Sequence, residues 1–324
     1  MLSPVVVGTL IQTGVVIILC VGFTFTYMVE KFPNFAHTAI ATLGTLITFT
    51  MVRIWDLNPY YAWPVSTLLC GLLGVGIYVF IVRPIKATGA REITLTFAFF
   101  ALAQVIGSLV SIYSYWFSRS QGRPASGFRV ISEDFTLWGY PGVLIVVVPV
   151  CAILVAALYY FMTKMKHGIA LRAVAEDEPL ASSLGINIKR IHILSWFITG
   201  ALAGLAGAII PLWRYTGLGY SDEFLVLVMA GSVMGGLHSV TGAVVGGLLA
   251  GVAQKALGAL MIALFGVGAS EYEALYPMIF IVAILMIEPH GIMGIFENPH
   301  TPMKTLRAKI ASIRGYLHKV THAA

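Results

Sequence analysis

Long apolar runs alternate with short polar segments along most of the chain. Several runs, such as residues 143–162, approach the ~20 apolar residues that an α-helix needs to cross a bilayer. The strands of a membrane barrel would instead show short segments of alternating hydrophobicity. The pattern therefore predicts an all-α polytopic membrane protein with about nine transmembrane helices, within a range of about eight to ten. The expected spans are residues 4–28, 35–54, 62–82, 93–117, 140–163, 191–213, 223–237, 241–265 and 274–287.

The amino-acid composition supports this assignment. Hydrophobic residues make up 58% of the 324 residues and charged residues only 10%, and the mean hydropathy is +0.89. These values exclude a soluble globular domain and favour a multi-pass protein of the cell (inner) membrane. The net charge of +6 does not indicate nucleic-acid binding, because most lysines and arginines fall in segments that the positive-inside rule assigns to the cytoplasm. Such basic segments attract anionic membrane lipid.

A polar segment at residues 168–184 separates two hydrophobic halves of the chain. Lysines and arginines flank it, so the positive-inside rule places it in the cytoplasm. Within it, Asp177, Glu178 and Pro179 are typical of a helix start, because Asp caps a helix and Pro is tolerated in the first turn. Gly185 would end this helix. We therefore expect a short helix at the membrane face, which a soluble motor protein holds in order to move the spans behind it.

A second distinctive stretch, at the boundary of the first two spans, combines a proline with polar side chains. Pro33 cannot continue a helix and Asn34 offers an amide, so the backbone is expected to unwind here and to expose hydrogen-bonding groups to a translocation pathway. Phe35 and His37 belong to the same stretch. Residues 30–34 fit either a cytoplasmic turn between two spans or a break that lies within the membrane.

Lys255 is a charged residue midway along the expected span 241–265. A charge at this depth is costly in lipid, so its side chain is expected to face the protein interior or a water-filled cavity. It could line the translocation pathway, form a structural ion pair, or reach towards the membrane surface.

Small residues recur at close spacing in the span that follows the polar segment. Gly200, Gly204 and Gly207 would let this helix approach its neighbours closely. The pattern is compatible with static packing and with a joint that moves, and the position after the polar segment favours movement.

The chain lacks the motifs with which a transporter would supply its own energy. It contains no GxxxxGK[ST] phosphate-binding loop, no HExxH zinc motif and no paired cysteine motif, so no catalytic residue, metal ligand or cofactor is assigned. We expect the energy to come from a partner. Residues 1–294 are expected to form the membrane domain, and residues 295–324 a basic cytoplasmic tail that is either an interfacial amphipathic helix or a solvated segment.

Several short motifs occur in order along the membrane domain. They are Asn34-Phe35-Ala36-His37, Arg83-Pro84, Leu171-Arg172-Ala173 with Glu176-Asp177, Gly185-Ile186-Asn187, Ala203-Gly204-Leu205-Ala206-Gly207, Gly235-Gly236-Leu237, and Pro289 with Gly291. Each motif is short, but the ordered set over nearly all of residues 1–294 resembles the branched-chain amino acid ABC transporter permeases. The first motif makes the chain more similar to the first of the two permease types in that family.

The resemblance implies a permease subunit that pairs with a second, related permease and with two cytoplasmic ATP-binding subunits. An extracytoplasmic substrate-binding protein would deliver a small molecule, a branched-chain or other apolar amino acid. In that family the central cytoplasmic loop holds a coupling helix that docks into the ATPase. The positions implied here are Arg172, Glu176, Asp177, Glu178, Pro179, Leu180, Ala181, Leu184 and Gly185.

The chain departs from the family pattern at Thr38, His238, Glu288 and Lys255. These departures leave the substrate open, since related permeases move urea, short amides or other amino acids. They do not touch the coupling loop.

Two other classes of protein compete with the permease hypothesis. An ion-coupled secondary transporter would need no ATPase and could use Lys255, Glu288 or His37 in its coupling path. A membrane enzyme has little support, because no nucleophile, base and orienting group cluster in the sequence.

Overall fold

Seven helices of the computed structural model are long and apolar enough to cross a membrane, among residues 3–122, 127–217 and 220–266 and the isolated positions up to 282 that the structure describes. They confirm the all-α polytopic fold. Five of them are single helices: α1 (Pro4–Glu30), α2 (His37–Trp55), α5 (Glu92–Gln121), α6 (Gly142–Lys164) and α11 (Val240–Phe265). The span Pro59–Ala87 consists of α3 (Pro59–Ile77), a π-helical turn (Tyr78–Val82) and α4 (Arg83–Ala87). The span Ile188–Leu212 consists of α9 (Ile188–Ile209) and a 3-10 turn (Ile210–Leu212).

The seventh predicted span, residues 223–237, is a helix that does not reach the length of a membrane crossing. Helix α10, Tyr220–Gly235, has 16 residues, which at ~1.5 Å per residue is shorter than the ~30 Å hydrocarbon core. Of the ninth predicted span, 274–287, only isolated positions are described, and the tail 295–324 lies outside the described residues.

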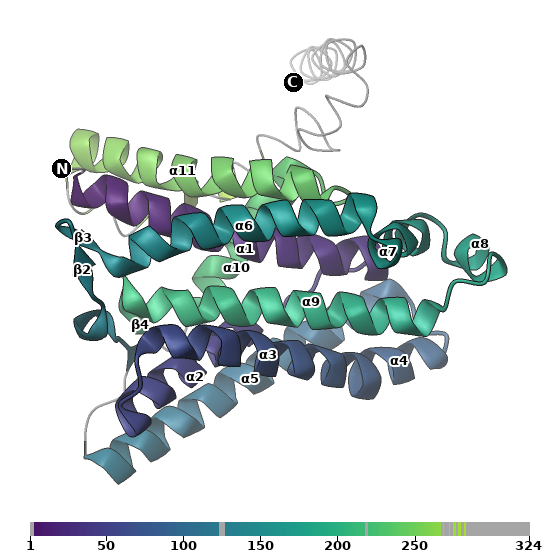
Figure 1. Ribbon diagram of the computed structural model, residues 1–324, viewed down its shortest axis with the longest axis horizontal. Coiled ribbons are helices and arrows are strands. Elements are labelled where there is room, and N and C mark those ends of the chain that lie inside the picture. The colour runs from purple at the N-terminus through teal and green to yellow at the C-terminus, as the bar shows by residue number, and fades with distance from the viewer. Residues whose placement is uncertain are drawn as a thin grey trace, which may run out of the picture.

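Helices α1 and α9 are the most buried of the seven membrane helices, and α9 lies between α6 and α3 in the view of Figure 1. Helices α2 and α3 pack against α9, while α6, α10 and α11 pack against α1. Helices α5, α6 and α11 expose most of their surface, as expected for helices that face lipid or another subunit. Of these two most buried helices, α1 directly precedes the polar stretch at residues 30–34, and α9 follows the polar segment at residues 168–184.

The glycines of α9 lie where this helix meets its neighbours most closely. A Cβ atom at Gly207 would clash with the carbonyl oxygen of Ala41 on α2, and one at Gly200 would clash with that of Cys70 on α3. A Cβ at Gly204 would lie 2.5 Å from the carbonyl oxygen of Ser66. The absence of side chains thus permits backbone contact on two sides of α9. A sliding role for this contact stays a prediction.

The two ends of the bundle differ in structure and in charge. Short strands tie the outer loops at one end: β1 (Gly127–Phe128) pairs antiparallel with β4 (Thr216–Gly217), and β2 (Thr136–Leu137) with β3 (Tyr140–Pro141), next to a 3-10 turn at Ile131–Glu133. The opposite end holds α4, α7 (Lys166–Glu176) and α8 (Glu178–Ser183) (Figure 1). This end is rich in basic residues and is the cytoplasmic one by the positive-inside rule: Arg83, Lys86, Arg91, Lys164, Lys166, Arg172, Lys189 and Arg190.

Candidate functional site

The polar stretch between α1 and α2 begins with a turn at the cytoplasmic end and continues as a non-helical break inside the bundle. Helix α1 ends at Glu30, and Lys31 turns the chain with a φ of 62°. The following residues run back along α1, so that α2 begins with the ring of His37 beside the middle of that helix. Its Nε2 atom lies 3.1 Å from the carbonyl oxygen of Leu19, about three turns before the end of α1. The structure thus combines features of both alternatives that the sequence left open: a turn at Lys31, and a buried non-helical segment before α2.

Two buried side chains of this break have polar atoms without a hydrogen-bond partner among the described residues. Asn34 uses its Oδ1 atom to accept a bond of 3.1 Å from the amide of Ala36, but its Nδ2 atom is unpaired. His37 uses Nε2 as above, and its Nδ1 atom is unpaired. Because a buried polar group without a partner is costly, these atoms indicate a place where a polar solute could be accommodated.

The short helix α10 reaches the same depth from another side of α1. The hydroxyl of Ser232 donates a bond of 3.2 Å to the carbonyl oxygen of Cys20, next to the carbonyl that contacts His37. Helix α10 ends three residues later, and Gly236 follows with a φ of 103°. The start of α2 and the end of α10 therefore meet the middle of α1 at adjacent residues. No pattern in the sequence pointed to this role of Ser232.

Helix α8 at the cytoplasmic end is the short helix expected from the polar segment. Asp177 caps it, since its Oδ1 atom accepts a bond of 2.8 Å from the amide of Leu180, and Pro179 lies in the first turn. Gly185 ends the helix with a φ of 85°, a conformation that favours glycine. The caps read from the sequence therefore set both ends of α8.

One face of α8 packs onto the bundle, and the rest of its apolar surface is exposed. Ala181 is only 2% exposed, whereas Leu180 is 57% and Leu184 73% exposed. Ala181 lies in a small core with Leu171 of α7 and Ile191 of α9. The two leucines are four residues apart and therefore lie on the same side of the helix, where they expose apolar surface, while the buried alanine connects the helix to the spans. Arg172 and Glu176, also predicted to act in coupling, are exposed on α7.

A buried carboxylate, for which the sequence predicted no role, links this end to the break. Glu30, the last residue of α1, has a fully buried side chain. Its Oε1 atom accepts bonds of 2.7 Å from Nδ1 of His192 and 2.7 Å from Nε1 of Trp196, both on α9. Its Oε2 atom lies 2.5 Å from Nζ of Lys86 on α4. A carboxylate needs such partners when it is buried, so Glu30 holds three helices together directly beside the break.

The ring of His192 extends this network to α8. Its Nε2 atom lies 3.6 Å from Oε1 of Glu178, the first residue of that helix, and the ring stacks on Tyr78 at 5.5 Å. The contacts therefore run from α8 through His192 to Glu30 and the break. A signal in the sequence was available, because Glu30 is an acidic residue at the end of an apolar run, but its partners lie far along the chain.

The remaining predicted residues are not all brought together. Lys255 lies half-buried on α11, and the adjacent Gln254 accepts a bond of 2.7 Å from Gln12, which is about two turns of α1 away from Leu19. The structure thus places Lys255 apart from the break. Phe35 lies in the break, with its ring 6.3 Å from that of Phe100.

Comparison with known proteins gives a consistent family. Residues 5–287 match the family model described as the permease component of the branched-chain amino acid transport system. The chain is 31% identical to the probable branched-chain amino acid transport permease protein LivH of Methanocaldococcus jannaschii, over 89% of this chain and 91% of the relative. It is 26% identical to the high-affinity branched-chain amino acid transport system permease protein LivH of Escherichia coli, over 86% and 90%. It is also 28% identical to the ribose import permease protein RbsC of Haemophilus influenzae, over 79% and 77%.

Proposed function

Because this chain belongs to the family of permease components of branched-chain amino acid transport systems, we propose that it imports branched-chain or other apolar amino acids as one membrane subunit of an ABC transporter. Two cytoplasmic ATP-binding subunits would supply the energy, a second related permease would complete the membrane part, and an extracytoplasmic binding protein would deliver the substrate. The chain itself would hydrolyse no ATP.

The observation that carries the proposal is the construction of α8. A capped helix at the cytoplasmic end exposes Leu180 and Leu184 while it anchors Ala181 in the core beneath it. Burial of exposed apolar surface favours protein–protein association, so the two leucines suit contact with the surface of a partner. An ion-coupled carrier would have no use for such a surface.

The contacts behind α8 suggest how its movement would reach the substrate pathway. A shift of α8 would act on His192 through Glu178, and on α9 through the core around Ala181. His192 in turn contacts Glu30, after which the chain enters the break with Asn34 and His37. Packed cores and ion pairs have discrete arrangements, so binding and release of the ATPase could switch the break between two states. We propose that these two states open the pathway to opposite sides.

Reconstitution of the complete transporter tests this function. The chain, the second permease, the ATPases and the binding protein are placed in proteoliposomes, and uptake of labelled leucine is followed with and without ATP. We expect uptake only with ATP and all subunits, and competition by isoleucine and valine. Uptake by this chain alone in response to an ion gradient would overturn the proposal in favour of a secondary transporter.

The same assay decides the substrate. Competition by urea, acetamide or ribose, in place of isoleucine, would assign a different small molecule to the transporter. Binding of those molecules to the extracytoplasmic binding protein is the independent check, because affinity in such systems would reside mainly in that protein.

A further inference from the structure

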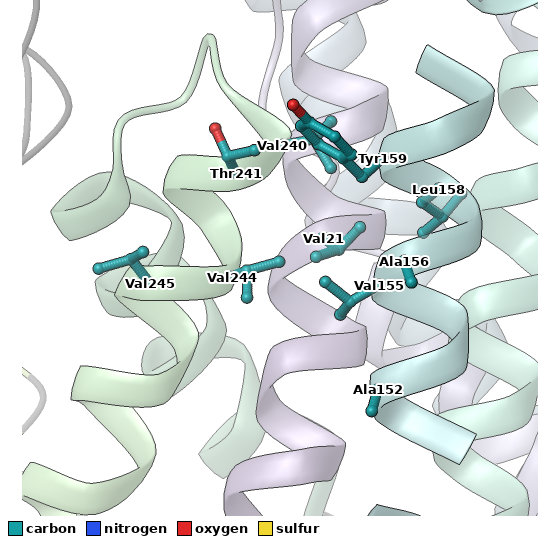
Figure 2. Close-up of a pocket in the computed structure, with 10 residues that line it drawn as sticks. All are labelled: Val21, Ala152, Val155, Ala156, Leu158, Tyr159, Val240, Thr241, Val244 and Val245. Atoms are coloured by element: carbon teal, nitrogen blue, oxygen red, sulfur yellow. The ribbon is translucent and has the colours of Figure 1, made fainter. Parts of the chain in front are cut away.

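A groove in the membrane part of the bundle is apolar over most of its length. It has a volume of about 540 Å³ and lies between α6 and α11, with Val21 of α1 at its floor (Figure 2). Its walls are formed by valine, alanine and leucine side chains, among them Val155, Ala156 and Val244. The hydroxyls of Tyr159 and Thr241 lie together at one end, as Figure 2 shows. That end is the cytoplasmic one, since α6 runs on from Tyr159 to Lys164 and α7.

The groove continues at this end into a second pocket, whose lining mixes apolar side chains such as Met28 and Met162 with polar ones. The second pocket has a volume of about 220 Å³ and shares Tyr159, Val240 and Thr241 with the first. Its other lining residues include Thr163, Arg172, His238 and Ser239. An apolar groove thus ends, at its cytoplasmic end, in a pocket that contains polar side chains and one arginine, Arg172.

Two features of the second pocket favour an anionic group. Arg172 is exposed on α7 and forms no ion pair with any residue that the structure describes; its guanidinium suits a phosphate. The start of α11, a helix of 26 residues capped by Ser239, forms another part of the wall. The amide groups of a first turn and the positive end of the helix dipole attract anions.

We propose that the joined pockets bind an anionic phospholipid of the inner leaflet. One acyl chain would lie in the apolar groove between α6 and α11, and the phosphate would lie between Arg172 and the start of α11. The order of the surfaces carries this assignment, because the apolar part lies at membrane depth and the part with Arg172 at the cytoplasmic interface, where anionic headgroups are found. A free phosphate would leave the apolar groove unexplained, and a zwitterionic lipid would bring the cation of its headgroup close to Arg172.

The site would connect the membrane to the cytoplasmic end of the bundle. Arg172 lies on α7, which leads directly into α8, and Met28 near the end of α1 lines the same pocket. A headgroup bound there would fix α7 relative to the inner leaflet. Lipid binding itself does not depend on the importer function proposed above, so the two proposals fail independently.

Native mass spectrometry of the full chain in detergent tests the site. The protein is titrated with phosphatidylglycerol and, separately, with phosphatidylcholine of the same acyl chains. We expect phosphatidylglycerol to bind more tightly, and Arg172→Gln to weaken it about fivefold, as one basic residue near a membrane surface contributes, with little effect on phosphatidylcholine. Arg190→Gln, which removes an exposed cytoplasmic arginine outside the pocket, is the matched control and should change neither titration.

A second pair of variants tests the apolar groove. Ala156→Trp would fill the groove and should abolish tight binding of phosphatidylglycerol, whereas Ala157→Trp, at the next exposed position of α6, lies outside the lining and should not. Equal binding of the two lipids by the unmodified chain would overturn the proposal. So would unchanged phosphatidylglycerol binding in Arg172→Gln or in Ala156→Trp, because the lipid would then bind outside the joined pockets.

Discussion

Glu30 and His192 are 162 positions apart in the chain, yet Oε1 of Glu30 and Nδ1 of His192 lie 2.7 Å apart in the interior of the bundle. Glu30 ends the helix that precedes the break, and His192 lies in the first turns of the helix that follows α8. The pair therefore joins the two segments that the sequence marks as unusual.

Replacement of Glu30 by Gln should destabilise the protein. The variant keeps the size of the side chain but removes the charge that Lys86 and His192 face, and loss of one partner of a buried ion pair costs about 3 kcal/mol. Thermal unfolding of the detergent-solubilised protein measures the change. Glu176→Gln, an exposed acid on α7, is the control and should alter stability by at most about 0.5 kcal/mol. Equal stability of the two variants would show that the network does not hold α1, α4 and α9 together.

Replacement of Leu184 by Glu should uncouple transport without harm to the fold. The side chain is 73% exposed, so stability should change by only about 0.5 kcal/mol, whereas a charge at the centre of an apolar contact weakens binding of a partner. Copurification with the ATPase and ATP-driven uptake are the measurements. Leu184→Met retains an apolar side chain of similar volume and should retain uptake. Normal uptake and normal copurification in Leu184→Glu would exclude this helix as the docking surface.

Replacement of Asp177 separates the cap of α8 from its charge. Asp177→Ala removes the bond to the amide of Leu180 and should cost about 1 kcal/mol of local helix stability. Asp177→Asn keeps an oxygen that can accept this bond and should preserve the helix. Hydrogen exchange at residues 180–186 reports helix stability, and uptake reports coupling. Asp177→Asn could lose as much uptake as Asp177→Ala although the amides of its helix stay protected from exchange. Coupling would then need the charge of Asp177 and not the cap.

Replacement of Gly22 by Ala should disturb the start of α2. A Cβ atom at this position would lie 2.7 Å from Cε1 of His37 and 3.2 Å from Cβ of Leu202. Because the ring is fully buried, it cannot move away freely, and overpacking of this kind costs about 1–3 kcal/mol. We expect reduced uptake by a complex that still assembles.

Gly107→Ala is the matched control for the Gly22 variant. Gly107 also lies on a membrane-spanning helix, but a Cβ atom there would meet nothing within 4 Å. It should leave uptake and thermal stability unchanged. A Gly22→Ala variant that behaves in the same way would place His37 outside the moving part of the pathway.

The sequence by itself determined the class of the protein and several local elements. The length of the apolar runs predicted the membrane helices, because a helix satisfies its own backbone hydrogen bonds and needs only enough apolar residues to cross the bilayer. Seven of the predicted spans are present in the described part of the chain. Asp177 and Gly185 likewise predicted both ends of α8, because caps act within a few residues of the chain.

Only the tertiary structure decided where the break lies and what it contacts. Pro33 and Asn34 predict that the helix stops, but the depth at which α2 restarts is fixed by the contact of His37 with Leu19. Residues distant in the chain likewise make the contacts among Glu30, Lys86 and His192. The same holds where the apolar groove between α6 and α11 joins the pocket that contains Arg172. Such contacts depend on how whole helices pack, and the local periodicity of a sequence carries no information on which polar residues then meet.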